Sequence, residues 1–195
     1  FKPSIRERHS MKITPAVVYY RQNLPHYRGP GCIYHCRFSL ILHSRFSGFT
    51  QDWMFEEVEK ALLIEHKQTC VIYAYAIMAT HTHTLIQPIP AVDEAGAWRD
   101  CSKYHELEKI CGRIKGRSAC EINKRLGFRG VRWQRESFDR TIRGDRDLEN
   151  SIDYIHHNPV RWKLVRSPEE YRWTSLRTIY SGRKEYAGWF ELETP

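Results

Sequence analysis

Two short strand-like segments in the middle of the chain constrain the fold most. Residues 70–78, CVIYAYAIM, are apolar, β-branched and aromatic, and this length and composition indicate a buried strand. Residues 82–88, THTLIQP, follow after a short connection, and Pro88 and Pro90 close this second segment. Strands joined by a short connection pair as an antiparallel hairpin. The sequence therefore predicts a β-hairpin at the centre of the fold.

The elements on either side of this hairpin alternate. In residues 32–42 every even position is apolar, which is the period of a strand with one buried face. Helices are predicted for 51–67, for 97–126 with an interruption near Gly116, and from Asp145 or Asp147 up to Pro159. A last short strand is predicted at 131–133. The order β-α-β-β-α-β and then α predicts an α+β fold, with a ferredoxin-like (RRM-like) split βαβ antiparallel sheet and an added C-terminal helix.

The length and composition predict one domain with two extensions. The chain has 195 residues, of which 41 % are hydrophobic, enough to fill a sizeable core. Residues 1–30 are rich in proline and basic side chains and are predicted to form an arm, residues 31–165 the domain, and residues 166–195 an extension packed on or beside it. The longest apolar stretch is far shorter than the roughly 20 residues of a membrane-spanning helix, and the N-terminus lacks an apolar signal core. We expect a soluble protein that is not exported.

The six cysteines are compatible with reduced thiols in the cytoplasm, because several lie in strand-like or helix-like stretches where a small buried thiol is common. A disulfide framework is one alternative. A structural zinc site at Cys32 and Cys36 is another, although no second pair follows at the spacing of a zinc finger.

Positive charge is concentrated in one part of the chain. The net charge of the whole chain is +8, and residues 113–143 alone hold ten basic and three acidic side chains. Such a concentration is typical of a surface that binds a polyanion. The alternative is a solvated helix face that happens to be basic. The candidate residues for such a surface are Arg113, Lys115, Arg117, Lys124, Arg125, Arg129, Arg132, Trp133, Arg135, Arg140 and Arg143.

A pair of histidines, His81 and His83, is the first candidate for chemistry. Two residues separated by one on a strand project to the same face, so both imidazoles could meet one cation while Thr82 faces the other layer. Taken alone, the pair is weak evidence for a metal site, and the alternative is a pair of surface or core imidazoles.

A second candidate lies in the last predicted helix. Tyr154 points away from the apolar stripe of that helix, and Asn158 follows one turn later on the same side. A phenol and an amide at this spacing supply a nucleophile and an oxygen ligand on the same side of one helix. The alternative is an interfacial tyrosine followed by a helix-terminating Asn-Pro pair.

Four blocks of the sequence resemble a known family, the REP-associated tyrosine transposases, which are single-tyrosine members of the HUH endonuclease superfamily. The blocks are QNLPHYRGPGCIYH (22–35), YAYAIMATHTHTLI (73–86), GVRWQRESFDRTIR (130–143) and SIDYIHHNPVRWKLV (151–165). Two positions depart from the family pattern: the bulky apolar residue between the histidines is Thr82, and the Pro-Asn pair before them is Ala79-Thr80.

The resemblance implies a residue-by-residue assignment of the site. His81 and His83 match the metal histidines, Tyr154 matches the nucleophile on the added, catalytic helix, and Asn158 matches a third, polar ligand. The implied cofactor is a divalent metal ion, Mg²⁺ or Mn²⁺, and zinc is a further alternative. The implied products are a 5′-phosphotyrosyl enzyme and a free 3′-hydroxyl. The proton acceptor for the phenol is either a metal-bound water or one of His156 and His157.

The implied partner is single-stranded or hairpin DNA that carries repetitive extragenic palindromes. Basic residues interleaved with Phe128, Trp133 and Phe138 are suited to phosphate contacts and base stacking, although the aromatic rings fit a core equally well. We expect a bacterial, cytoplasmic, nucleoid-associated protein with no membrane partner and no obligate protein partner, more readily a monomer than a dimer. Two alternative functions are a catalytically silent, domesticated nucleic-acid-binding protein and a metal hydrolase that uses the histidine pair without a covalent tyrosine.

Overall fold

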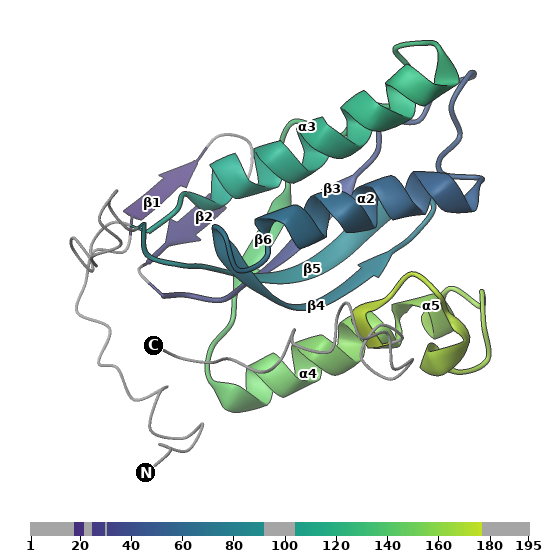
Figure 1. The fold of residues 1–195 in the computed structure, drawn as a ribbon. Coiled ribbons are helices and arrows are strands. Elements are labelled where there is room, and N and C mark those ends of the chain that lie inside the picture. The colour runs from purple at the N-terminus through teal and green to yellow at the C-terminus, as the bar shows by residue number, and fades with distance from the viewer. Residues whose placement is uncertain (1–17, 22–24, 30, 92–103, 177–195) are drawn as a thin grey trace.

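The computed structural model describes residues 18–21, 25–29, 31–91 and 104–176 (Figure 1). The elements, in chain order, are β1 (Val18–Arg21), β2 (Pro25–Arg28), β3 (Tyr34–Ser39), α2 (Asp52–Glu65), β4 (Cys70–Ile77), β5 (His81–Pro88), α3 (Leu107–Leu126), β6 (Phe138–Thr141), α4 (Asp145–His156), α5 (Asn158–Arg161) and the 3-10 turn η1 (Pro168–Glu170).

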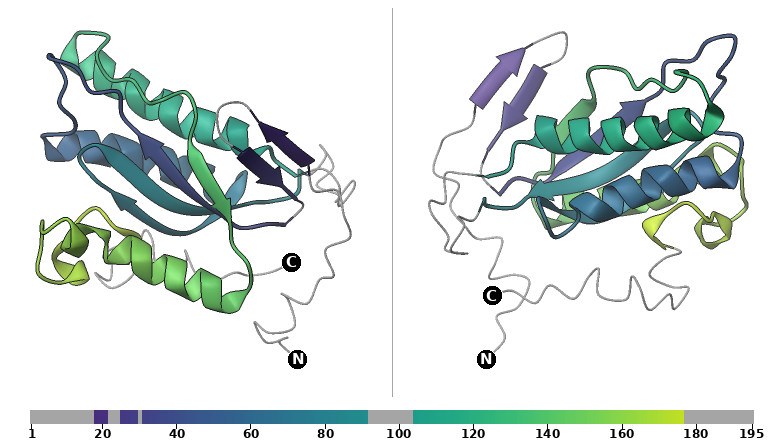
Figure 2. Two further views of the ribbon diagram at one scale, coloured as in Figure 1. Left: turned by 180° about the vertical axis from the view of Figure 1, so that it is seen from behind. Right: turned by 45° about the horizontal axis from the view of Figure 1, so that its top comes forward.

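The main sheet has four strands in the order β4-β5-β3-β6, and every neighbouring pair is antiparallel. Strands β3 and β4 are joined through α2, and β5 and β6 through α3, so each helix crosses over one intervening strand. Helices α2 and α3 cover one face of the sheet and α4 lies on the other (Figures 1 and 2). This is the split βαβ arrangement, and the predicted α+β fold with its central hairpin is confirmed.

The main core lies between the sheet and helices α2 and α3. Its side chains include the even positions of β3, as their alternation predicted, with Tyr34 and Phe38 among the fully buried ones. Helix α2 contributes Val58 and Leu62 at i and i+4, and α3 contributes a stripe that contains Ile114. A smaller cluster on the opposite face packs α4 against the sheet and contains Ala74, Ala76, Leu85 and Ile155.

The predicted helix at 97–126 is wrong at residues 104–106, which are not helical, and in its interruption; residues 97–103 lie outside the described part of the chain. Within the described residues the chain is still extended at Tyr104, which bridges Pro90, and the backbone N–H of His105 donates to the carbonyl of Ile89. These contacts hold residues 104 and 105 beside the end of β5, so α3 begins at Leu107. The helix then runs unbroken through Gly116 to Leu126, and Gly127 ends it at φ 69°.

The predicted strand at 131–133 is also wrong in position. Trp133 makes one bridge to Leu40, and this segment lies beside the chain that continues from β3 without forming a regular strand. The edge strand is instead β6, which pairs with β3 from Arg37 to Tyr34. The sequence of β6, FDRT, has only exposed and half-buried positions, so it lacks the apolar alternation that identifies a strand.

The predicted arm at 1–30 contains the hairpin β1–β2, which forms a two-stranded sheet of its own, while residues 1–17 lie outside the described part of the chain. The predicted extension at 166–195 is described up to residue 176. Its Trp173, Thr174 and Ser175 are buried, and the carbonyl of Trp173 accepts from the backbone N–H of Ile77 at the open edge of β4. Residues 177–195 lie outside the described residues.

Five of the six cysteines lie in the described residues, and each is a free thiol; Cys101 lies outside them. Of the helices in the described ranges, none has both the length and the apolar character to cross a membrane.

Candidate functional site

Strand β5 turns the two candidate histidines toward α4. His81 and His83 alternate with Thr82, so both imidazoles lie on the face of the sheet opposite α2 and α3. The two ring centroids are 5.1 Å apart and both side chains are buried. The strand period therefore places the pair in one site, as expected.

The register of the sheet brings further polar residues beside this pair. His83 faces Arg37 across the β3–β5 ladder, and Arg37 faces Phe138 across the β3–β6 ladder. Two residues along β3, His35 faces Arg140 in the same way. Together with α4 and α5, these strands enclose a cleft of about 670 Å³. The lining residues are His35, Arg37, His81, His83, Phe138, Arg140, Asp147, Asn150, Ser151, Tyr154, Asn158 and Trp162.

Helix α4 carries Tyr154 into the cleft from the other side. Ile155 is buried in the cluster beneath the sheet, and this packing fixes the rotation of the helix. The ring of Tyr154 lies 5.7 Å from the ring of His83 and 5.7 Å from the ring of His35, measured between centroids. The guanidinium of Arg161 lies 4.9 Å from the centre of the Tyr154 ring. Tyr154 remains 38 % exposed, so a substrate can reach its phenol.

Asn158 begins α5, one turn beyond Tyr154, and is only 2 % exposed. Its Oδ1 is buried, and among the described residues no hydrogen-bond donor reaches it. Buried polar atoms without a partner are rare in folded proteins, so each one calls for a specific explanation such as an absent ligand. An amide oxygen in the lining of a cleft that also holds two imidazoles is a suitable ligand for a hard cation.

The environment of the histidines suits metal binding. Burial lowers the pKa of His81 to about 4 and that of His83 to about 3, with a further contribution from the positive charge of Arg37. Both imidazoles are therefore neutral at pH 7, the form that binds metals. Nδ1 of His81 lies 3.1 Å from Oγ1 of Thr80, and Nδ1 of His83 lies 3.0 Å from Nε2 of His35. Protonation at Nδ1 satisfies both contacts and leaves each Nε2 lone pair open.

The residues present fit a divalent ion held by two imidazole nitrogens and one amide oxygen, from His81, His83 and Asn158. In the described ranges no three His, Cys, Asp or Glu side chains come together as a metal site, so the amide is needed to complete the set. Nitrogen and oxygen donors of this kind are compatible with both Mn²⁺ and Mg²⁺.

The two histidines that follow Tyr154 do not line the cleft. Nε2 of His156 lies 2.8 Å from Oγ of Ser175 in a buried contact, and burial lowers the pKa of His156 to about 4. Nδ1 of His157 lies 2.9 Å from the carbonyl of Asp153, within its own helix. Neither contact directs an imidazole toward the phenol of Tyr154.

The structure divides the predicted basic cluster among different surfaces. Arg113 and Arg117 lie on α3, across the sheet from the cleft, and both pair with the buried Glu65. Lys115 donates to the backbone carbonyls of Gln134 and Arg135. These three cations are therefore occupied within the protein.

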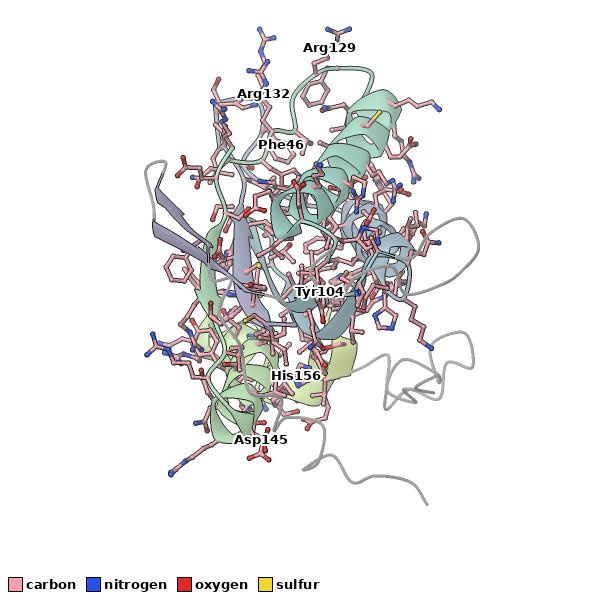
Figure 3. The ribbon with its side chains drawn as sticks, turned by 90° about the vertical axis from the view of Figure 1, so that its left-hand side faces the viewer. Phe46, Tyr104, Arg129, Arg132, Asp145 and His156 are labelled. Atoms are coloured by element: carbon pink, nitrogen blue, oxygen red, sulfur yellow. The ribbon has the colours of Figure 1, made fainter. Side chains whose placement is uncertain are left out.

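Other members of the cluster are exposed. Lys124, Arg125, Arg129, Arg132 and Arg135 lie at or beyond the C-terminal end of α3. Arg129 and Arg132 project from the end of the molecule opposite Asp145 and His156 of α4 (Figure 3). Only Arg140 lines the cleft, where it pairs with Asp147 at 2.8 Å, and Arg143 lies just before α4.

Trp133, expected among the DNA-binding residues, belongs to the main core. It is 9 % exposed, its Nε1 donates to Oγ of Ser118, and its ring meets Phe38 edge to face. Its indole therefore has no free face for a base.

Several residues of the cleft are not among the sequence-based site residues. His35, Arg37 and Trp162 are three of them, and Asp147, Asn150 and Ser151 are others. His35 and Arg37 occupy odd positions of β3, and the strand period alone could have placed them on the polar face with His83. No pattern in the sequence distinguishes Trp162 from a core tryptophan.

The chain is similar in sequence and in fold to known proteins. No protein-family model matches the chain. A curated protein of Haemophilus influenzae, provisionally named a REP-associated tyrosine transposase, is 29 % identical over 148 residues, which are 71 % of this chain and 77 % of that protein. A solved structure described as a REP-associated tyrosine transposase bound to a REP hairpin has a TM-score of 0.62 at 15 % identity and covers 83 % of this chain and 87 % of its own. In sequence, this chain is similar to a protein named as a REP-associated tyrosine transposase, and its fold is similar to that of a solved one.

Proposed function

We propose that the protein is a metal-dependent DNA endonuclease and transesterase that cleaves and rejoins single-stranded DNA beside REP-type hairpins. The observation that carries the proposal is the convergence of Tyr154, His81, His83 and Asn158 on one cleft, from a strand and two helices of the same chain. The structural neighbour, bound to a REP hairpin, supports this class of substrate. Because all four residues come from one chain, we propose that a monomer carries a complete site.

Tyr154 would act as the nucleophile. Its Oη forms a bond to the scissile phosphorus, and the bond from phosphorus to the 3′-oxygen breaks. The phenolic proton passes to solvent and the departing 3′-oxygen takes up a proton, so a 5′-phosphotyrosyl adduct and a 3′-hydroxyl remain. Attack by a 3′-hydroxyl on the same phosphorus reverses the exchange and rejoins the strand.

His81, His83 and Asn158 would hold the divalent ion at the edge of the cleft next to Tyr154. When bound, Mg²⁺ or Mn²⁺ supplies positive charge that polarises the scissile phosphate and offsets the charge that develops on it. Arg37 adds a second positive charge beside His83, and within the described residues its guanidinium has no carboxylate partner. The exposed basic residues beyond α3 would contact the DNA backbone away from the reaction.

We place this activity on chromosomal DNA in the bacterial cytoplasm.

Neither His156 nor His157 reaches toward the phenol of Tyr154, so we assign no side chain of the protein as the acceptor of the phenolic proton, and water takes that role.

Denaturing electrophoresis of labelled DNA tests the proposal. Wild-type protein, incubated with Mn²⁺ and a REP-type hairpin with single-stranded flanks, should yield a shorter strand and a protein-linked strand. Tyr154→Phe keeps the ring but removes the nucleophile, so it should bind the hairpin and form neither product. Tyr73→Phe is the matched control, because Tyr73 lies on β4 with its hydroxyl bonded to Gln87, outside the cleft.

The outcomes separate the alternatives. Peptide mapping should find the nucleotide on the segment 151–158. Cleavage that persists in Tyr154→Phe without an adduct would indicate a metal hydrolase. Hairpin binding by wild-type protein with no cleavage under any metal would indicate a nucleic-acid-binding protein without activity.

A further inference from the structure

Trp162 is an exposed indole at the cleft. It is 61 % exposed, the largest exposed fraction among the large hydrophobic side chains of the described residues. Single exposed apolar side chains are common on protein surfaces. Trp162 differs from them because it lines the cleft and its ring lies beside that of His81. Trp162 is therefore an accessible aromatic surface within the proposed substrate site.

The backbone around Trp162 is fixed although its ring is exposed. Trp162 is the C-terminal cap of α5, and its N–H donates to the carbonyl of Asn158 at 3.0 Å. The next residue, Lys163, has a φ of 56°, so the chain turns away directly after the indole. The ring is thus presented from a defined position, one turn beyond the candidate metal ligand.

The only ring near Trp162 in the described residues is that of His81, at 5.8 Å between centroids and an interplanar angle of 56°. The Nε1–H of the indole has no acceptor there either. Arg37 lies opposite His83 on the neighbouring strand β3, and in the described residues its guanidinium has no carboxylate partner. The histidine pair thus has an aromatic ring beside His81 and a cation across the strand ladder from His83.

We infer that Trp162 is a stacking platform for an unpaired base of the DNA strand, adjacent to the phosphate that lies at His81 and His83. This inference rests on the proposed function and specifies how the cleft holds its substrate. Every base has a π-face, and indole rings stack on it in many proteins that bind single strands. Arg37 contacts a phosphate of the same strand, so base and backbone are held together.

Binding of two simple strands tests the inference. One probe is a strand of about 12 thymidines and the other is an abasic strand with the same number of phosphates. Fluorescence anisotropy should show that Trp162→Ala weakens binding to the thymidine strand about tenfold and leaves binding to the abasic strand unchanged. Trp162→Phe should retain most of the affinity. Leu164→Ala is the control, because Leu164 is similarly accessible on the same segment but does not line the cleft.

The possible failures can be told apart. Equal affinity of wild-type protein and Trp162→Ala for the thymidine strand, or equal losses on both strands, would overturn the inference. Wild-type protein that prefers neither strand would also overturn it, because a stacking platform needs a base. If the Tyr154 adduct nevertheless forms on the hairpin, the proposed function stands and only the role of Trp162 is wrong.

Discussion

Tyr154 of α4 and His83 of β5 meet edge to face across the cleft, with ring centroids 5.7 Å apart and an interplanar angle of 85°. This contact brings together the histidine pair and the tyrosine segment, which lie about seventy residues apart in the sequence. A phosphate that reaches a cation on His83 lies within the range of the phenol. This proximity, more than any property of either residue alone, makes the cleft a candidate for phosphoryl transfer.

The histidine pair should be required for metal binding and cleavage but not for DNA affinity. We expect His83→Ala to abolish Mn²⁺ binding, measured by titration calorimetry, and to abolish cleavage of the hairpin. Affinity for the hairpin should stay near the wild-type value, because the exposed basic residues lie elsewhere. His105→Ala serves as a control outside the cleft. If the His83→Ala protein cleaves the hairpin at the wild-type rate, the histidine pair has a structural role only.

His35 should act through His83. Its Nε2 lies 3.0 Å from Nδ1 of His83 and orients that ring. Loss of such a hydrogen-bond partner typically weakens metal binding by about 10- to 100-fold. We expect His35→Ala to show a loss of this size in Mn²⁺ titrations while the protein stays folded, and His35→Gln to recover part of it. If both variants bind Mn²⁺ with unchanged affinity, His35 plays no part in metal binding.

Thr82, which replaces a bulky apolar residue between the histidines, should limit stability. Its Oγ1 is fully buried, and no partner for it lies in the described residues. Thr82→Val keeps the shape and removes the unsatisfied hydroxyl, so it should raise the free energy of unfolding by about 1 kcal/mol in urea denaturation.

Thr174→Val is the matched control for this change, because the hydroxyl of Thr174 donates to the carbonyl of Tyr171. It should give no gain. Equal gains in both variants would argue against the unsatisfied hydroxyl of Thr82 as the cause.

The exposed and the occupied arginines should differ in their effect on DNA binding. Each arginine that binds a phosphate should contribute about 0.7 to 0.9 to the slope of log affinity against log salt. We expect Arg129→Ala and Arg132→Ala each to reduce the slope by this amount. Arg113→Ala should leave the slope unchanged, because that guanidinium pairs with Glu65 on the far side of the sheet. Equal slopes for all three variants would contradict the division of the cluster.

Glu65 should make stability depend on acid pH. Burial raises the pKa of this carboxyl, but hydrogen bonds from Arg113 and Thr69 and the charge of Arg117 outweigh burial and lower the pKa overall. A group with a lowered folded-state pKa stabilises the protein above its unfolded pKa, about 4.3 for Glu, and that stabilisation is lost as the pH falls. The Tm of wild-type protein should exceed that of Glu65→Gln at about pH 6, and the difference should shrink toward about pH 3. A Tm difference that does not change with pH would assign the effect of Glu65→Gln to packing alone.

The sequence by itself determined the elements with strong periodicity and the side chains that each element places on one face. Local spacing identifies the buried even positions of β3, the apolar stripe of α2 and the central hairpin. It also places His81 and His83 on one face of a strand, and Tyr154 and Asn158 on one side of a helix. Such spacing is a local property of the backbone, so it can be recognised without knowledge of the rest of the chain. The polar strand β6 lacks this spacing, which is why the sequence predicts the last strand in the wrong place.

Only the tertiary structure decided which of these faces meet. The register of β3 beside β5 brings His35 and Arg37 next to His83, and the packing of Ile155 turns Tyr154 toward them. It also assigns Trp133 to the core and the α3 arginines to the opposite face from the site. These contacts join residues distant in sequence, and they depend on strand order and on the burial of whole faces, which no local pattern encodes.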